Sequence, residues 1–131
     1  MHMVTVAIAM LICFQVKHYL ADYVLQPEWV LSGKGDLHKS GGYIHAGIHV
    51  AGSLPALLIA GLGVLPIVAF LAVEFAIHYA IDFTKSTLSA HSKAGPNTRK
   101  YWALHGADQL LHQLTYAGLI FGALYLTSAG Q

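Results

Sequence analysis

The chain has 131 residues, of which 56% are hydrophobic and only 10% are charged, with a formal net charge of +1 and a positive mean hydropathy. The low charge and the long apolar runs argue against a soluble globular protein and indicate a polytopic membrane protein. A net charge this small gives no case for nucleic-acid binding, and the single cysteine cannot form an internal disulfide.

The sequence predicts one domain, residues 1–131, that crosses the membrane four times. The predicted helices cover about residues 4–26, 43–62, 66–86 and 98–127. Pro27 ends the first helix, and Pro66 suits the first turn of the third. Each helix has about 20 residues or more, the length that crosses a hydrocarbon core. Because backbone polar groups in lipid must be satisfied within the segment, the predicted fold class is all-α, a four-transmembrane-helix bundle.

The basic residues predict how the helices are oriented. All of them except Lys17 lie in or beside the first and third connections: Lys34, Lys39, Lys85, Lys93, Arg99 and Lys100. In multi-pass membrane proteins the excess of Lys and Arg lies in the cytoplasmic loops. The pattern therefore predicts that loops one and three are cytoplasmic and that both termini lie outside.

Each predicted helix carries two ionisable side chains four residues apart, which places both on one face. The pairs in chain order are His18 and Asp22, His45 and His49, His78 and Asp82, and Asp108 and His112. Ionisable residues inside a membrane are costly, and by default they mark a functional site. Counted at 1.5 Å per residue from the predicted helix ends, the pairs fall in one layer near the cytoplasmic side.

The pairs also repeat along the chain. Corresponding positions lie sixty to sixty-three residues apart: His18 with His78, Asp22 with Asp82, His45 with Asp108, and His49 with His112. This spacing predicts two duplicated helical hairpins, repeat 1 at about 4–62 and repeat 2 at about 66–127. Since the first and third helices run in the same direction, the halves should be parallel repeats about an axis along the membrane normal.

Five histidines and three aspartates at one level predict a transition-metal centre. Imidazole and carboxylate together suit Zn, Fe, Mn or Ni, and four-helix bundles hold paired metal ions with such side chains. Eight candidate ligands exceed one tetrahedral site, so the hypothesis is a divalent metal, zinc by preference, with room for two ions. The alternative is a metal-free buried polar network or proton relay.

Glu74 is the candidate catalytic residue. It lies one helical turn before His78 on the same face. Three roles stay open for it: metal ligand, general base, or ion-pair partner of Lys17, which could equally extend to the interface. Hydrogen bonds that orient the ligands could come from three further polar residues: Gln26, His105 and Gln109.

The leading functional hypothesis is metal-dependent hydrolysis of a lipid or prenyl-phosphate-type substrate at the cytoplasmic face of the bilayer. A bound metal lowers the pKa of its water toward about 7 and polarises a phosphoryl oxygen. Glu74, or an Asp that does not bind metal, would move the proton. The alternative is a non-catalytic, metal-stabilised interaction protein or a transport protein. Transport needs a continuous polar path, and the outer halves of the helices carry no comparable residues.

Four motifs, KHYLADYVLQPEW, HAGIHV, HYAIDFTKS and DQLLHQL, carry a resemblance that spans nearly the whole chain. With them the sequence resembles domain-of-unknown-function family 3307, small polytopic membrane proteins of bacteria and their phages. The resemblance implies a bacterial inner (cytoplasmic) membrane protein and supplies no activity. The architecture is also loosely similar to small bacterial membrane proteins labelled metal-dependent hydrolases.

Overall fold

The computed structural model describes residues 2–92 and 94–129, and within these ranges the chain is helical, with no strand. Its elements are α1 (His2–Tyr19), a π-helical turn η1 (Leu20–Val24), the short α2 (Glu28–Leu31), α3 (Gly41–Ile59), α4 (Val64–Ser92) and α5 (Arg99–Ala129). Four of the helices are long and apolar enough to cross a membrane. The predicted all-α, multi-pass fold class is thereby confirmed.

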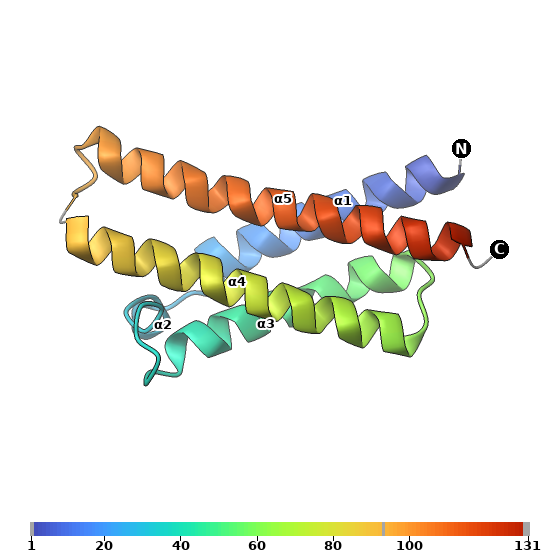
Figure 1. Cartoon of the computed structure of the whole chain (residues 1–131), viewed down its shortest axis with the longest axis horizontal. Coiled ribbons are helices and arrows are strands. Elements are labelled where there is room, and N and C mark those ends of the chain that lie inside the picture. The colour runs from blue at the N-terminus through green and yellow to red at the C-terminus, as the bar shows by residue number, and fades with distance from the viewer. Residues whose placement is uncertain (1, 93, 130–131) are drawn as a thin grey trace.

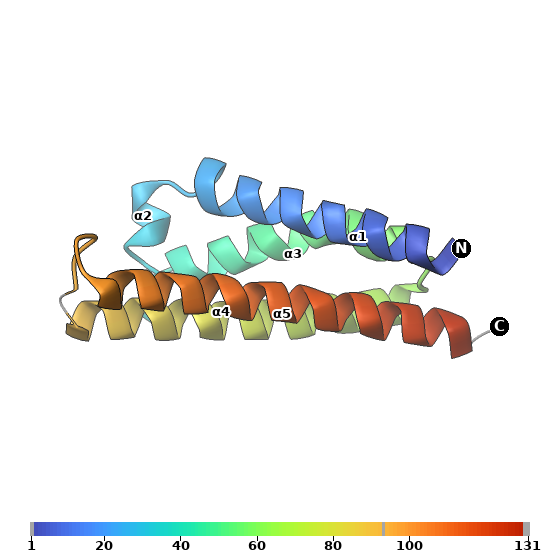
Figure 2. The ribbon, with the colours of Figure 1, turned by 90° about the horizontal axis from the view of Figure 1, so that it is seen from above.

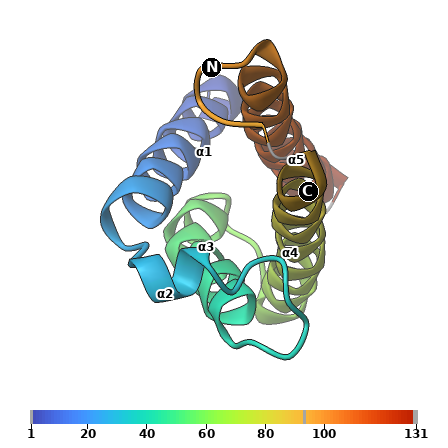
Figure 3. The ribbon, with the colours of Figure 1, turned by 90° about the vertical axis from the view of Figure 1, so that its left-hand side faces the viewer.

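The four long helices form a ring. Each packs against the next in the chain, and α1 closes the ring against α5, as the end-on view shows (Figure 3). α2 and the α4–α5 connection lie at one end of the bundle, and both termini and the α3–α4 turn lie at the other (Figures 1 and 2). The first and third connections therefore share one side. The duplication of the hairpins stays a prediction.

Two helix ends differ from the predicted spans. The first helix finishes in the π-helical turn η1, where the N–H of Leu25 donates to the carbonyl of Leu20 at 2.8 Å. α4 extends to Ser92, beyond the predicted end near residue 86. Hydropathy indicates where a helix leaves lipid, but the helix itself can continue into water. Pro96, which follows the end of α4, is a residue that could not continue it.

An apolar core fills the half of the bundle nearer the termini. Its buried members are Met10, Phe14, Ala56, Leu57, Ala60, Ile67, Tyr116, Leu119 and Ala123. The rings of Phe14 and Tyr116 stack with centroids 5.0 Å apart, which joins α1 to α5. These side chains form the floor beneath the ionisable residues, so the polar layer is closed toward the terminal end.

Small residues set how closely the helices approach. A Cβ on Gly52 would lie 3.1 Å from the Cβ of Lys17 in α1, and one on Gly122 would lie 3.0 Å from the ring of Phe70 in α4. Gly118 differs, because a Cβ there would meet no heavy atom within 4 Å among the described residues. α4 and α5 are therefore in close contact at Gly122 and separated beside Gly118.

The first connection packs back onto the end of the bundle. Val30 of α2 is 1% exposed and Lys34 is 5% exposed. A Cβ on Gly41, at the start of α3, would lie 2.6 Å from the carbonyl oxygen of Val30, so only glycine fits at this crossing. The sequence had placed Lys34 among the loop cations, and the packing of this loop instead brings its ammonium group inside the bundle.

Candidate metal centre

The eight predicted ligands lie in the interior of the bundle. Seven are buried, and the side chain of Asp22 is 14% exposed. They come from all four long helices and η1, because each i, i+4 pair occupies one helix face and each of those faces is turned toward the centre of the ring. The layer lies between the apolar core and the end that carries α2.

Asp22 contacts three histidines from the first half of the chain. Its Oδ2 lies 3.3 Å from Nε2 of His18, and its Oδ1 lies 3.1 Å from Nε2 of both His45 and His49. Only the contact with His49 also has hydrogen-bond direction. Asp22 sits in the π-helical turn η1, and such turns are rare and frequent at functional sites.

Asp82 makes the corresponding cluster in the second half. Its Oδ2 lies 3.5 Å from Nε2 of His78, and its Oδ1 lies 3.9 Å from Nε2 of His112. The Oδ2 of Asp82 is also 3.3 Å from Nε2 of His45, and it forms an ion pair with Nζ of Lys34 at 2.8 Å. Since His45 touches both Asp22 and Asp82, it lies between the two clusters.

Three groups of donor atoms are compact enough to hold a metal ion, with all atoms of a group within 4.8 Å of one another. They are His18 with Asp22 and His49, His78 with Asp82 and His112, and His45 with His49 and His78. Asp108 belongs to none of these groups among the described residues. Its Oδ1 is 3.8 Å from Nδ1 of His112 on its own helix.

The spacing of the donor atoms suits a first-row metal. With metal–ligand bonds of about 2.0–2.1 Å, neighbouring ligands of a tetrahedral site lie about 3.3 Å apart. The nitrogen–oxygen separations around Asp22 and Asp82 run from 3.1 to 3.5 Å for the contacts with His18, His45, His49 and His78. The residues present therefore fit a divalent ion in geometry as well as in donor type.

Several of these atoms are buried and have no hydrogen-bond partner among the described residues. They are both ring nitrogens of His45 and of His78, Nε2 of His112, Oδ2 of Asp82 and Oδ1 of Asp108. The Oδ2 of Asp82 lies near Lys34 without hydrogen-bond direction. A buried polar atom left unpaired costs about 1–3 kcal/mol. A cation in this layer would therefore satisfy lone pairs that the protein leaves unused.

Lysines neutralise three of the four carboxylates in and beside the layer. The pairs are Lys17 with Glu74 at 2.5 Å, Lys34 with Asp82 at 2.8 Å and Lys85 with Asp108 at 3.4 Å. Asp22 has no lysine within ion-pair distance in the described part of the chain. With neutral histidines the layer keeps one unbalanced negative charge, and a single divalent ion would make it net positive.

Glu74 lies one turn below the histidines, toward the apolar core, and is fully buried. Its Oε1 accepts from Lys17 and, at 2.7 Å, from the hydroxyl of Ser53. Lys17 in turn reaches Nδ1 of His49 at 3.3 Å. Of the three roles left open for Glu74, this geometry favours the ion-pair partner of Lys17, placed behind His49.

Four residues that contact the site escaped the sequence reasoning: Lys34, Ser53, Lys85 and Tyr116. The hydroxyl of Tyr116 is 2.9 Å from Nδ1 of His18, whose Nε2 is 3.0 Å from Oε1 of Gln109. A hydroxyl in an apolar helix is a weak signal, but Tyr116 falls one turn after His112, on the face that carries the ligands.

Gln109 is the predicted orienting residue that the structure places against the ligands, because it contacts Asp22 and Asp108 as well as His18. Gln26 donates to the backbone carbonyl of Asp22 at 3.2 Å. His105 packs its ring beside Tyr101 and Trp102 near the start of α5, and in the described part of the chain these ring contacts include none of the predicted ligands.

No curated protein and no solved structure matches the chain. One family model does, and it covers residues 6–129, which include every member of the polar layer. The family that the four motifs resemble is thereby confirmed: the chain belongs to the family described as protein of unknown function DUF3307.

Proposed function

We propose that the polar layer binds divalent transition metal, zinc by preference, and hydrolyses a phosphate ester of a membrane lipid at the cytoplasmic face. The observation that carries the proposal is the convergence of seven buried or partly buried His and Asp side chains, from four helices, into three compact donor groups. Structural ion pairs explain the lysine contacts, but they leave both ring nitrogens of His45 and His78 and Nε2 of His112 without hydrogen-bond partners among the described residues.

Two ions suit the arrangement better than one. The group around Asp22 and the group around Asp82 share no residue, and their members occupy corresponding positions of the two proposed repeats. His45 lies between them and could contact either ion. Two-metal sites clamp both the attacking and the leaving oxygen of a phosphoryl group, which supports phosphoester chemistry over other hydrolysis.

The reaction we propose is addition of water to phosphorus with cleavage of the bond to the lipid oxygen, giving a lipid alcohol and inorganic phosphate. The metal supplies acidification of water and polarisation of the phosphoryl oxygen. The proton from water needs a carboxylate acceptor, and the leaving oxygen needs a proton. Asp108 suits this role better than Glu74, because Asp108 lines a hollow on the outside of the bundle, whereas Glu74 is fully buried. Each of the two carboxylates has one oxygen in contact with a lysine and one without a hydrogen-bond partner among the described residues.

The test measures metal and activity on the same preparation. Protein purified in detergent without chelator should contain one to two equivalents of zinc or another transition metal by elemental analysis. It should release inorganic phosphate from a lipid phosphomonoester, and chelation should abolish the release while readdition of metal restores it. Protein that contains metal and releases no phosphate from any phospholipid or prenyl phosphate would end the hydrolase proposal and leave the metal site.

The orientation we propose places the α2 end of the bundle in the cytoplasm. Lys39, Arg99 and Lys100 all lie at that end, which is the arrangement that positive-inside topology favours. A reporter active only in the cytoplasm should work when inserted at Asn97, an exposed position of the α4–α5 connection, and should be silent when fused after residue 131. The reverse pattern would place the polar layer near the outer face.

The metal-free polar network is the second candidate, and one observation favours it. A chain of contacts already links Glu74, Lys17, His49, Tyr116 and His18 without any ion. Transport is less well supported, because the apolar core that includes Met10, Leu57 and Leu119 lies beneath the polar layer. The metal analysis above separates the network from the metal centre.

A further inference from the structure

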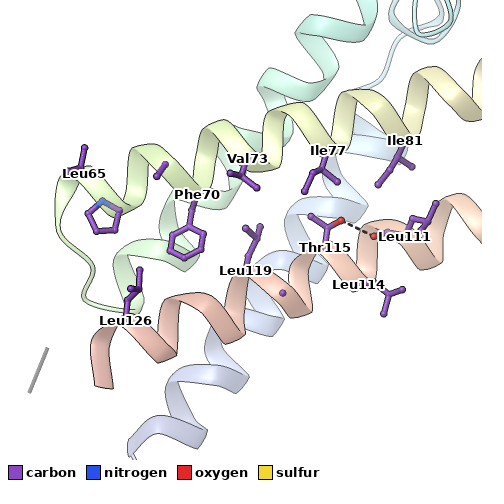
Figure 4. A pocket seen from close by; sticks show the side chains of 13 residues that line it. Leu65, Phe70, Val73, Ile77, Ile81, Leu111, Leu114, Thr115, Leu119 and Leu126 are labelled. Carbon is purple, nitrogen blue, oxygen red and sulfur yellow. Dashed lines mark hydrogen bonds between the residues drawn. The ribbon is translucent and has the colours of Figure 1, made fainter. Parts of the chain in front are cut away.

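A long apolar groove follows the outside of the bundle between α4 and α5. Its main part, about 800 Å³, is lined from α4 by Phe70, Val73 and Ile77 and from α5 by Thr115, Gly118 and Leu119. In the close-up these α4 side chains extend toward those of α5 (Figure 4). The hydroxyl of Thr115 donates to the carbonyl of Leu111 within the helix at 2.9 Å, so the groove offers a ligand little but apolar surface.

The groove continues into a second hollow of about 340 Å³ toward the cytoplasmic end. The two share Ile77, Ile81 and Leu111, and the second also includes Lys85 and Asp108. A side chain of the proposed catalytic layer therefore lines the wall of a channel that is open to lipid. Asp108 is the residue of the polar layer that lines this hollow among the described residues, and its Oδ1 lies 3.8 Å from Nδ1 of His112, so the hollow meets the layer beside the donor group of Asp82.

The length of the groove bears on what fills it. Its lining on α4 runs from Leu65 to Leu88, which is about 35 Å at 1.5 Å per residue. That length exceeds the hydrocarbon core of about 30 Å and is more than twice one leaflet. An acyl chain of a phospholipid ends near the midplane and would leave the outer part empty. A polyisoprenoid chain is long enough to follow the whole groove.

The charged residues at the cytoplasmic end of the groove indicate which head group the lipid carries. The ammonium of Lys85 lies 3.4 Å from Asp108, and its side chain is 31% exposed, so it can turn to an incoming anion. With Lys85 included, the layer becomes net positive once one divalent ion is bound, as the charge balance above shows. A phosphate at this point would meet Lys85 on one side and the metal centre on the other.

From the groove, its length and its charged end we propose that the substrate is a polyprenyl phosphate, with the prenyl chain between α4 and α5 and the phosphate at Lys85. This proposal rests on the proposed function, since it names the substrate of that centre. Gly118 is the position that keeps the groove open, because nothing in the described structure lies within 4 Å of where its Cβ would be.

Binding is measured apart from catalysis, as the dissociation constant for displacement of a fluorescent polyprenyl phosphate from the full chain in detergent. The competitors are a polyprenyl phosphate longer than the bilayer core, farnesyl phosphate, phosphatidic acid and the free polyprenol. Gly118→Leu should weaken binding of the long chain about tenfold by filling the groove. Lys85→Gln should weaken binding of the long polyprenyl phosphate about tenfold and leave the affinity for the free polyprenol unchanged.

The matched control is Gly106→Leu, an exposed glycine of the same helix that also has no neighbour within 4 Å and does not line the groove. It should bind as the wild type does. Equal affinity for phosphatidic acid and the long polyprenyl phosphate would overturn the proposal, as would unchanged binding in Gly118→Leu. If Gly118→Leu instead turns a dimer into a monomer, the groove is a contact between two copies and the proposal is wrong.

The two proposals fail separately. Tight, Gly118-dependent binding without phosphate release would end the hydrolase function and leave the lipid site. If neither Gly118→Leu nor Lys85→Gln affects phosphate release, the metal-dependent function stands and the proposed lipid site is wrong. Should Gly118→Leu not fold, Lys85→Gln with the phosphate and polyprenol pair still decides the position of the head group.

Discussion

Replacing Asp22 with alanine should remove at least one equivalent of metal from the purified protein. Asp22 provides the carboxylate of one donor group and contacts His18, His45 and His49. Loss of a residue that only orients a ligand costs about 10–100-fold in metal affinity, so loss of a ligand should cost about 100-fold or more. The measurement is elemental analysis together with competition against a chelator of known affinity.

Asp22 is a cleaner choice than Asp82. Replacing Asp82 would also strand the buried ammonium of Lys34, and the fold could fail for that reason alone. Asp36→Ala is the control, because Asp36 is an exposed loop carboxylate that pairs with Lys39 at 3.9 Å, and its metal content should match the wild type. Wild-type protein without metal, equally stable with and without added zinc, manganese or iron, would contradict the metal centre and favour the polar network.

Replacing Lys17 with methionine should destabilise the bundle by about 3–5 kcal/mol, because it strands the fully buried carboxylate of Glu74. The double variant Lys17→Met with Glu74→Leu should recover most of that loss, since a buried pair can often be replaced by apolar residues of similar volume. Lys17 already lies 4.4 Å above the ring of Tyr116, and a methionine thioether also packs well there. The free energy of unfolding in detergent, measured for the wild type, for Lys17→Met, for Glu74→Leu and for the double variant, completes a double-mutant cycle.

The cycle also decides the role of Glu74. If the losses of stability in the two single variants add up to the loss in the double variant, Lys17 and Glu74 act independently, which would contradict the ion-pair role. A double variant that is stable and still releases phosphate would make Glu74 a structural residue. A double variant that is stable, keeps its metal and is inactive would restore Glu74 as a participant in the chemistry. Ser53→Ala, which removes one hydrogen bond to Glu74, should cost only about 1 kcal/mol.

The helices and the ligand faces could be predicted because both depend on local pattern. Apolar runs of about 20 residues indicate spans, and an i, i+4 pair such as His78 and Asp82 must share a helix face whatever surrounds it. Four such pairs in an apolar chain are expected to face the interior of the bundle, because lipid cannot solvate ionisable side chains. The structure accordingly finds them in the centre of the ring.

The partners of those residues could not be predicted in the same way. Lys34 lies in a loop rich in glycine and polar residues, and it pairs with Asp82 where that loop folds back onto the bundle. Gly41 permits this fold, because it lets the start of α3 contact the carbonyl of Val30 in α2. Ser53 reaches Glu74 across two helices. Such contacts depend on where backbones cross, and spacing along the chain carries no information about crossings.

The four helical spans and the residues of the polar layer could be predicted, because hydropathy and helical periodicity act within each segment. Four short motifs indicated the family, and the family model confirms it. The division of the layer could not be predicted: Asp22 and Asp82 belong to separate donor groups, His45 contacts both, and Asp108 pairs with Lys85 at the groove. The rotation of each helix about its axis and the π-helical turn at Asp22 are set by packing between helices, so the distances across the bundle arise only when all four helices meet.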